Sequence, residues 1–247
     1  MITPKQARGF ISNNKQTKRR RINMKRLIST IAFLIIFSFP LYSQVTFQIG
    51  GGAGYSTASG DLSKEISFMN DSGYGMNNGF NLHAKARAGL LSFVAVGEVG
   101  YTMMSADGSV GSVKYENKLN VLSLKVGPEF HLSLPLIPID PYLGANFQVN
   151  TFTGESKISG MPGIASDTYD MESATRYGIG INGGVIFSLG GLKLDLNIGY
   201  NLLNAFGKEF ENNPEANKFY LDDGEIGNRD TRSINAVEFK ATIMFGL

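Results

Sequence analysis

The chain has 247 residues, with 23 Lys and Arg, 21 Asp and Glu, and a formal net charge of +2. It contains no Cys and two His, which excludes disulfides, thiolate metal sites and cysteine nucleophiles and disfavours zinc chemistry. Nine of the basic residues lie in the first 43 positions, where there is no Asp or Glu, so residues 44–247 hold 14 basic and 21 acidic residues and carry a net charge of −7. An acidic chain gives no electrostatic reason to expect a nucleic-acid partner.

The N-terminal region has the pattern of an export signal. Met24-Lys25-Arg26 is followed by an apolar stretch, Leu27–Leu41, and the segment ends on the small residue Ser43. This pattern predicts a secretory signal peptide at residues 24–43 with cleavage after Ser43. The apolar stretch is shorter than the roughly 20 residues that a spanning helix needs. Residues 1–23 precede the natural start of the signal, and we interpret them as an upstream extension that is not part of the mature protein.

Residues 44–247 fit one domain and contain eight segments in which apolar side chains alternate with polar or small ones. Leu192–Asn201 is the clearest, with leucine, isoleucine or tyrosine at every even position and Lys193, Asp195 and Asn197 among the residues between them. Successive side chains of a strand point to opposite faces, so each segment predicts a two-faced strand. In chain order the predicted strands are Thr46–Thr57, Phe80–Leu90, Phe93–Met104, Leu119–Leu132, Tyr142–Thr151, Arg176–Leu189, Leu192–Asn201 and Ile234–Leu247.

Alternation alone does not decide which face points inward, because a soluble exported ligand-binding barrel has apolar side chains inside and polar ones outside. Three features favour the opposite arrangement. Short connections (Leu91-Ser92, Ser133–Asp140, Gly190-Gly191) alternate with long polar ones at residues 58–79, 105–118, 152–175 and 205–233. The polar face is rich in glycine, which suits the crowded lumen of a small barrel. Strands of about 10–12 residues are long enough to cross the apolar layer of an outer membrane.

The sequence therefore predicts an all-β fold, an eight-stranded antiparallel up-and-down transmembrane β-barrel of residues 44–247, located in the outer membrane. Aromatic residues near the strand ends are expected to form the interfacial girdles. These residues are Tyr55, Phe93, Tyr101, Phe130, Tyr142, Tyr177, Phe187, Tyr200 and Phe245.

Four motifs make residues 44–247 resemble the OmpA-like small outer-membrane β-barrels of Gram-negative bacteria. They are Gly51–Ser56 running into Ser59–Leu62, Val96–Tyr101, Pro141–Ala145 and the closing segment Phe239–Leu247. Such barrels usually end in Phe, whereas this chain ends in Leu247 with Phe245 two residues earlier. The resemblance implies a structural, adhesive or narrow-channel protein of the cell envelope. No residues follow the last strand that would form a peptidoglycan-binding domain, so that anchoring role is not expected.

The predicted polar face collects charges of both signs, which must be paired or hydrated in a narrow interior. We interpret them as a network of ion pairs that closes the lumen, with a narrow ion or small-solute channel as the alternative. The members of this network are Lys85, Arg87, Glu98, Lys125, Glu129, Arg176, Lys193, Asp195, Glu238 and Lys240.

Catalytic and metal sites are not predicted. His131 and Ser133 resemble the His-x-Ser pair of lipid A deacylase barrels, but they fall at the short-turn end, and Asp140 follows a proline-rich turn. We therefore interpret His131, like His83, as part of the lumenal polar network. The acidic segment Ala205–Ser233 lacks the ligand spacing of a calcium loop. We expect no enzyme activity, cofactor or metal.

The expected partners are outer-membrane lipid and an extracellular protein or glycan. A rigid scaffold places binding function in its loops, so the contacts with an extracellular partner are assigned to the long connections 58–79, 105–118, 152–175 and 205–233.

Overall fold

The computed structural model describes residues 45–64, 73–132, 138–160, 167–211, 215, 218–221 and 231–246. These residues belong to one compact unit, Gln44–Leu247. The predicted upstream extension (1–23) and signal peptide (24–43) lie outside the described residues, so both stay predictions.

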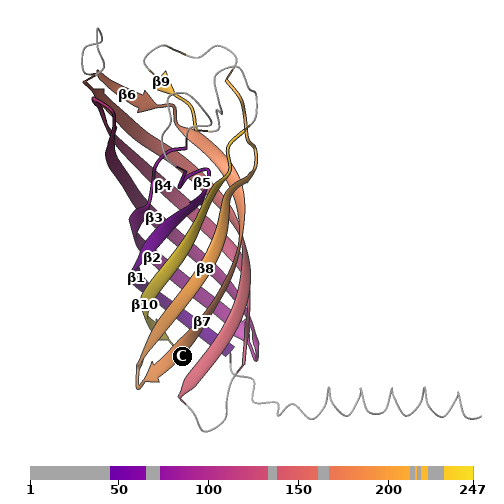
Figure 1. The fold of residues 1–247 in the computed structure, drawn as a ribbon. Helices are drawn as coiled ribbons and strands as arrows, with labels where there is room; N and C mark the ends of the chain where they lie inside the picture. Colours follow the sequence, from indigo (N-terminus) through magenta and orange to yellow (C-terminus); the bar gives the residue numbers. More distant parts are fainter. Residues whose placement is uncertain are drawn as a thin grey trace, which may run out of the picture. The chain divides into compact units, whose positions relative to one another are not determined.

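Eight long strands form a closed antiparallel barrel, as predicted (Figure 1). Each strand pairs with its neighbours along the chain, the first pairs with the last, and the pairing between the fourth and fifth completes the ring. Closure leaves no free strand edge in the barrel wall. The strands are β1 (Val45–Gly60), β2 (Asn78–Leu90), β3 (Phe93–Val110), β4 (Val113–His131), β5 (Ile139–Ser159), β7 (Ala174–Leu189), β8 (Leu192–Phe206) and β10 (Ile234–Gly246).

The two ends of the barrel differ, as the sequence predicts. One end, here called the turn end, carries the two-residue turns Leu91-Ser92 and Gly190-Gly191, and β1 starts there because Val45 pairs with Leu90. The opposite end, here called the loop end, carries the long connections. The C-terminus also lies at the turn end (Figure 1).

The prediction of a loop at residues 105–118 is wrong. β3 and β4 continue through it as a hairpin whose two-residue turn is Gly111-Ser112, with Val110 paired to Val113. Gly111 has a φ of 63°, the left-handed conformation that a tight hairpin turn requires and that glycine adopts without strain. The polar composition of this segment suggests a loop, whereas the glycine turn flanked by β-branched valines is a hairpin signal.

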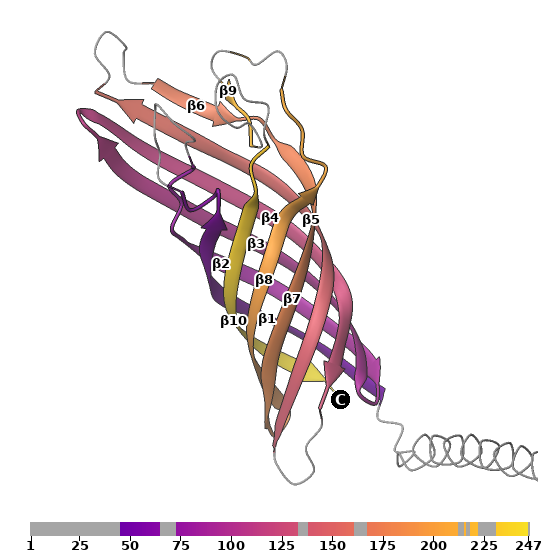
Figure 2. The same cartoon turned by 45° about the vertical axis from the view of Figure 1, so that its right-hand side comes forward.

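The predicted loop 152–175 is also partly strand. β5 runs on to Ser159, and a short strand β6 (Asp167–Met171) pairs with it before β7 begins at Ala174. A two-residue strand β9 (Lys218–Phe219) pairs in parallel with β6. Beyond the barrel rim, β3, β4, β5 and β6 form a projecting sheet, here called the rim sheet (Figure 2). The described residues include no helix long and apolar enough to cross a membrane.

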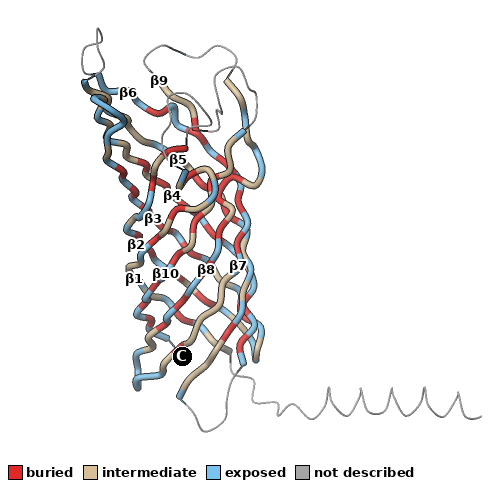
Figure 3. The backbone as a smooth tube through the Cα atoms, in the orientation of Figure 1, coloured by how far each residue is buried: buried red, intermediate tan, exposed pale blue. Residues whose placement is uncertain are grey.

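Burial alternates along the strands (Figure 3). The buried residues of the barrel wall are mostly polar and the exposed ones are mostly apolar, so polar side chains face the lumen and apolar ones face outward. Leu143 and Ile181 are 68% and 67% exposed, whereas Asp195 and Gln148 are 0% exposed. Seven of the nine predicted girdle aromatics point outward and are exposed: Tyr55, Phe93, Tyr101, Phe130, Tyr177, Tyr200 and Phe245. Phe187 is half-buried.

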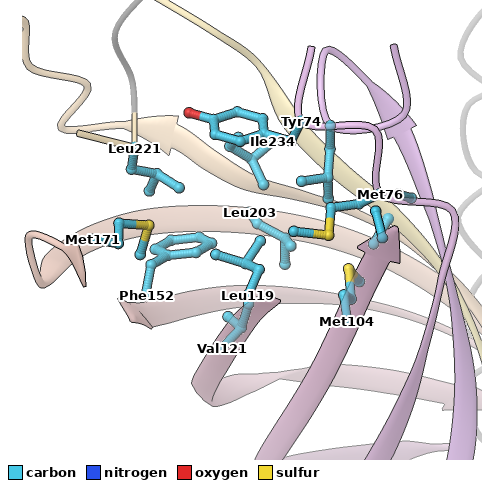
Figure 4. Close-up of a cluster of buried hydrophobic side chains, with 14 of the residues drawn as sticks. Tyr74, Met76, Met104, Leu119, Val121, Phe152, Met171, Leu203, Leu221 and Ile234 are labelled. Atoms are coloured by element: carbon cyan, nitrogen blue, oxygen red, sulfur yellow. The ribbon is translucent and has the colours of Figure 1, made fainter. Parts of the chain in front are cut away.

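A cluster of buried apolar side chains fills the lumen beneath the loop end (Figure 4). Leu119, Val121, Phe152 and Leu203 enter it from the barrel strands. Leu62, Tyr74, Met76, Met171 and Leu221 enter it from the connections and from β6, and Phe152 is completely buried. We call this cluster the apolar cap. The alternation pattern does not predict the apolar cap, because it places the cap residues of the barrel strands on a face that is otherwise polar.

Truncating the apolar cap should destabilise the barrel more than truncating its outer face. Phe152→Ala empties a fully buried position and should lower the free energy of unfolding by about 3–5 kcal/mol. Phe239→Ala, an outward and half-exposed position, is the matched control and should cost much less. Urea titration of the purified barrel in lipid vesicles measures both, and equal losses would contradict the assignment of Phe152 to a packed core.

Candidate functional site

An ionic layer crosses the lumen near the turn end. The Arg87 guanidinium donates from Nε to Glu129 Oε2 over 2.7 Å and from Nη2 to Asp195 Oδ2 over 2.9 Å. Lys85 Nζ lies 3.0 Å from Asp195 Oδ2 and 3.2 Å from Glu129 Oε1. All four side chains are almost fully buried. Two cations and two carboxylates therefore neutralise each other in an interior where an isolated charge would cost several kcal/mol.

Tyr142 belongs to this layer, so its predicted place in the aromatic girdle is wrong. Its hydroxyl donates to Asp195 Oδ1 over 2.7 Å and accepts from Asn197 Nδ2 over 2.9 Å. The Arg87 guanidinium carbon lies 4.7 Å from the centre of the Tyr142 ring, a cation–π contact. The alternation of its strand identifies the position: Leu143 points outward, so Tyr142 must point inward. A Cβ at Gly184 would lie 2.5 Å from the Tyr142 hydroxyl oxygen, so this glycine makes room for the ring.

His131 extends the ionic layer to the turn end. Its Nδ1 lies 3.0 Å from Asp140 Oδ2 and its Nε2 lies 3.2 Å from Glu129 Oε2, while its ring stacks on Tyr142 at 5.2 Å. The fold thus brings His131 and Asp140 together across the turn that separates them in sequence. Ser133 lies outside the described residues.

A second ionic layer, here called the quartet, lies midway along the barrel strands. Glu98, Lys125, Glu238 and Lys240 alternate in sign, with Lys125–Glu238 and Lys240–Glu98 each at 2.5 Å and Lys240–Glu238 at 3.4 Å. The quartet also has no net charge. Its members come from β3, β4 and β10, so the ion pairs tie together strands that are distant in sequence.

Amide and hydroxyl side chains fill the lumen around the quartet and up to the apolar cap. His83 bonds Asn81 and Thr242 at 2.9 and 2.8 Å, and Ser123 donates to Asn150 over 2.7 Å. Along β5 the lumenal residues change in order from Tyr142 through Asn146, Gln148 and Asn150 to Phe152. The interior therefore passes from ionic to amide to apolar between the turn end and the loop end.

Two of the ten predicted network residues lie apart from both ionic layers. Arg176 is buried at the loop end, where it donates to Thr175 O and lies 3.9 Å from Glu209. Lys193 is half-buried beside the Gly190-Gly191 turn and forms no ion pair with any described residue. Their strand face is lumenal, but both occupy strand ends, away from the carboxylates of the two ionic layers. The other eight, Lys85, Arg87, Glu98, Lys125, Glu129, Asp195, Glu238 and Lys240, lie in the two layers.

The loop end is fixed by backbone and side-chain hydrogen bonds. Asp61 accepts from Ser233 N over 2.7 Å and pairs with Lys64 at 2.7 Å. Partial burial raises the pKa of the Asp61 carboxyl, but the hydrogen bonds from Lys64 and Ser233 and the charges of Lys64 and Arg232 outweigh it and hold that pKa below its ordinary value. Asp61 is therefore ionised at neutral pH and ties the end of β1 to the start of β10.

A small cavity lies beside the quartet. It has a volume of about 30 Å³ and is lined by Lys85, Glu98, Lys125, Glu238, Lys240 and several asparagines. A cavity of that size holds about one or two water molecules. Within the described ranges, no group of three or more His, Asp or Glu is arranged to hold a metal ion.

No protein-family model and no curated protein matches the chain. Among solved structures it is similar to neisserial surface protein A, with 16% identity over 81% of this chain and 96% of that one and a TM-score of 0.48. A major outer membrane protein from Thermus thermophilus has 14% identity over 81% and 99% of the two chains and a TM-score of 0.49. Ail, the attachment invasion locus protein of Yersinia pestis, has 17% identity over 81% and 99% and a TM-score of 0.39. The fold assignment rests on the strand pairing within this chain.

Removing one carboxylate from the ionic layer should be strongly destabilising. Asp195→Asn leaves Arg87 and Lys85 with Glu129 as their one remaining carboxylate, and should lower the free energy of unfolding by about 3–5 kcal/mol because it leaves excess buried charge. Glu155→Gln, which removes the solvent-accessible Lys118–Glu155 pair, is the control and should cost far less, because water screens such a pair. Urea titration compares the two, and similar losses would argue against a tightly coupled buried layer.

Proposed function

We propose that the mature protein is an integral outer-membrane β-barrel with a closed lumen that acts through its loop end, in a structural or adhesive role. The observation that carries the proposal is the polarity of the wall. Leucine, valine, isoleucine and phenylalanine side chains are exposed around the outside, whereas charged and amide side chains are buried inside. A water-soluble barrel has the reverse arrangement.

Insertion in a membrane accounts for this polarity. Exposed apolar side chains cover the outward faces of all eight barrel strands, among them Phe47, Leu82, Val99, Leu124, Leu143, Ile181, Ile198 and Ile243. Such a continuous apolar surface would drive aggregation in water and matches the lipid-facing band of outer-membrane barrels. The same observation disfavours the soluble exported ligand-binding barrel.

The packing of the lumen favours a structural or adhesive protein over a channel. A permeant ion would have to pass two ionic layers whose charges are already paired and then the apolar cap, whose side chains are nonpolar apart from the Tyr74 hydroxyl. The predicted absence of enzyme activity is part of this proposal, since the described lumen offers no concave site open to a substrate.

The proposed orientation places the loop end outside the cell and the turn end in the periplasm, as short periplasmic turns and long extracellular loops are arranged in such barrels. Loops on a rigid scaffold are where binding concentrates. The rim sheet, which replaces the loop predicted at residues 105–118, is the most extended part of this surface (Figure 2). We assign contact with an extracellular protein or glycan to it and to the neighbouring connections.

A charge on the lipid-facing wall should be penalised only within the membrane. Leu196→Arg should lower the free energy of unfolding in lipid vesicles by about 2–4 kcal/mol, the cost of arginine near the bilayer midplane. Val110→Arg at the tip of the rim sheet is the control, because Val110 and Leu196 are equally exposed at 41% and 43% but only Leu196 would face lipid. Equal effects at the two positions would contradict membrane insertion.

The closed lumen can be tested by conductance. Purified protein inserted in a planar bilayer should show no ion current at moderate voltage, and Glu98→Ala, which removes a quartet carboxylate, should remain silent because the apolar cap still blocks the path. Discrete openings in the native protein that change in the Glu98→Ala variant would overturn the closed-lumen proposal in favour of a channel.

A further inference from the structure

A cavity of about 270 Å³ lies at the loop end, next to the apolar cap. Its walls come from the rim sheet, the returning segment 73–76, β9 and Arg232. Strand alternation turns Tyr115 and Asn117 of β4, Ser156 and Ile158 of β5, and Tyr169 of β6 to the same face of the sheet. The cavity therefore lies against the inner face of the rim sheet and is separate from the two ionic layers.

The lining of this cavity is mainly aromatic and aliphatic. The rings of Tyr74, Tyr115, Tyr169 and Phe219 and the side chain of Ile158 form its walls, and Met76 and Leu119 of the apolar cap lie at its base. Tyr115, Tyr169, Ile158 and Phe219 are each only partly buried, so they keep surface that an apolar ligand could cover. Flat rings around an apolar base favour a planar or compact hydrophobic body.

The main polar groups of the walls are already bonded to one another. Asn117 Nδ2 donates to the backbone oxygen of Tyr74 over 3.1 Å, and Ser156 Oγ donates to Asn117 Oδ1 over 2.6 Å. These bonds hold the 73–76 segment against the rim sheet and fix the cavity's shape. They engage the Asn117 amide and the Ser156 hydroxyl, and the remaining wall is mostly ring and aliphatic surface, so the walls favour an apolar body over an array of ligand hydroxyl groups such as a sugar.

The charged side chain on the cavity side is positive. Arg232 lines the cavity, and among the residues that the structure describes no Asp or Glu does so. Lys118 also belongs to the lining, but strand alternation turns its side chain away from the face of Asn117 and Leu119, and its Nζ is held there by Glu155 at 2.8 Å and Glu116 at 3.2 Å. The Arg232 guanidinium carbon lies 4.8 Å from the centre of the Tyr74 ring, which places a cation directly at the aromatic wall. A guanidinium in that position favours an anionic group such as a carboxylate, sulfonate or phosphate.

From these observations we propose that the cavity binds a small hydrophobic molecule, aromatic or of similar flatness, that carries one anionic group. The apolar body lies against Tyr115, Tyr169 and Phe219, and the anion lies beside Arg232. The inference rests on the proposed function only in placing this cavity on the cell surface, because binding itself depends on the purified barrel alone.

The test uses the folded barrel in lipid nanodiscs, naphthalene-2-sulfonate as the probe, and empty nanodiscs as the blank. Isothermal titration should give saturable one-to-one binding to the native protein. The neutral analogue naphthalene-2-methanol should bind about tenfold more weakly, since it lacks the charge-assisted contact. Failure of naphthalene-2-sulfonate to saturate the native protein, or equal affinity for both probes, would overturn the proposal.

Matched variants locate the site. Ile158→Trp fills the cavity and should abolish binding, whereas Lys157→Trp, the neighbouring residue on the opposite face of β5, should leave it intact. Arg232→Gln should weaken naphthalene-2-sulfonate about tenfold and leave naphthalene-2-methanol unchanged, and Lys114→Gln on the outer face should affect neither. Undiminished binding in Ile158→Trp, or an equal loss in Lys157→Trp, would show that the probe binds elsewhere. The barrel's heat-modifiable migration in electrophoresis confirms that each variant is folded.

Cell fractionation separates this inference from the proposed function. Recovery of the chain in a soluble periplasmic fraction would overturn the outer-membrane proposal without touching the cavity. Loss of binding in the purified native barrel would overturn the cavity proposal without touching the location.

Discussion

The structure depends on the pairing of Arg87 with Glu129 and Asp195 inside a barrel whose outer wall is apolar. An apolar outer wall leaves the lumen as the place for the charges of the alternating strands. Charges there are tolerated because each ionic layer contains two cations and two carboxylates within 4 Å of each other. The layers draw on strands from both halves of the sequence, so they also fix the register in which the barrel closes. The glycines that line the lumen follow from the same constraint, as Gly184 does beside Tyr142.

The proposed closure of the lumen would rest on two different kinds of packing. The ion pairs near the turn end and midway along the barrel carry no net charge but are still polar. Water can enter small gaps among them, such as the 30 Å³ cavity beside the quartet. The apolar cap at the loop end is nonpolar apart from the Tyr74 hydroxyl, so it would exclude ions by a separate mechanism. Opening an ion path would require both sets of contacts to rearrange at once, which is why a rigid scaffold is the better reading than a gated channel.

Period-two alternation was sufficient to predict the number of barrel strands, their order and which side chains share a face, because the pleat turns successive side chains to opposite sides. Which face points inward had to be argued from loop lengths and from the glycine-rich polar face. Eight of the ten charged residues lie in the two ionic layers, but pairing partners such as Lys125 and Glu238 depend on shear and tilt that one sequence does not show. Tyr142 was wrongly assigned to the girdle because the prediction gave more weight to its being aromatic than to its position in the alternation, which places it on the lumenal face. The hairpin at 105–118 was missed because polar composition outweighed the Gly111-Ser112 turn, and the apolar cap was missed because its members come from segments far apart in the chain.

The cavity beside the quartet and the loop-end cavity differ in a way that bears on function. Beside the quartet, every charge has a partner of opposite sign and the free volume is large enough only for water, so that cavity offers nothing to a larger ligand. The loop-end cavity is about nine times larger, is walled by rings that remain partly exposed, and has a cation at its edge. A surface of this kind gains free energy when an apolar body displaces water from it, by about 25 cal/mol per Å² covered. A ligand is therefore expected at the rim sheet beside Arg232. The packed side chains of the lumen support that sheet.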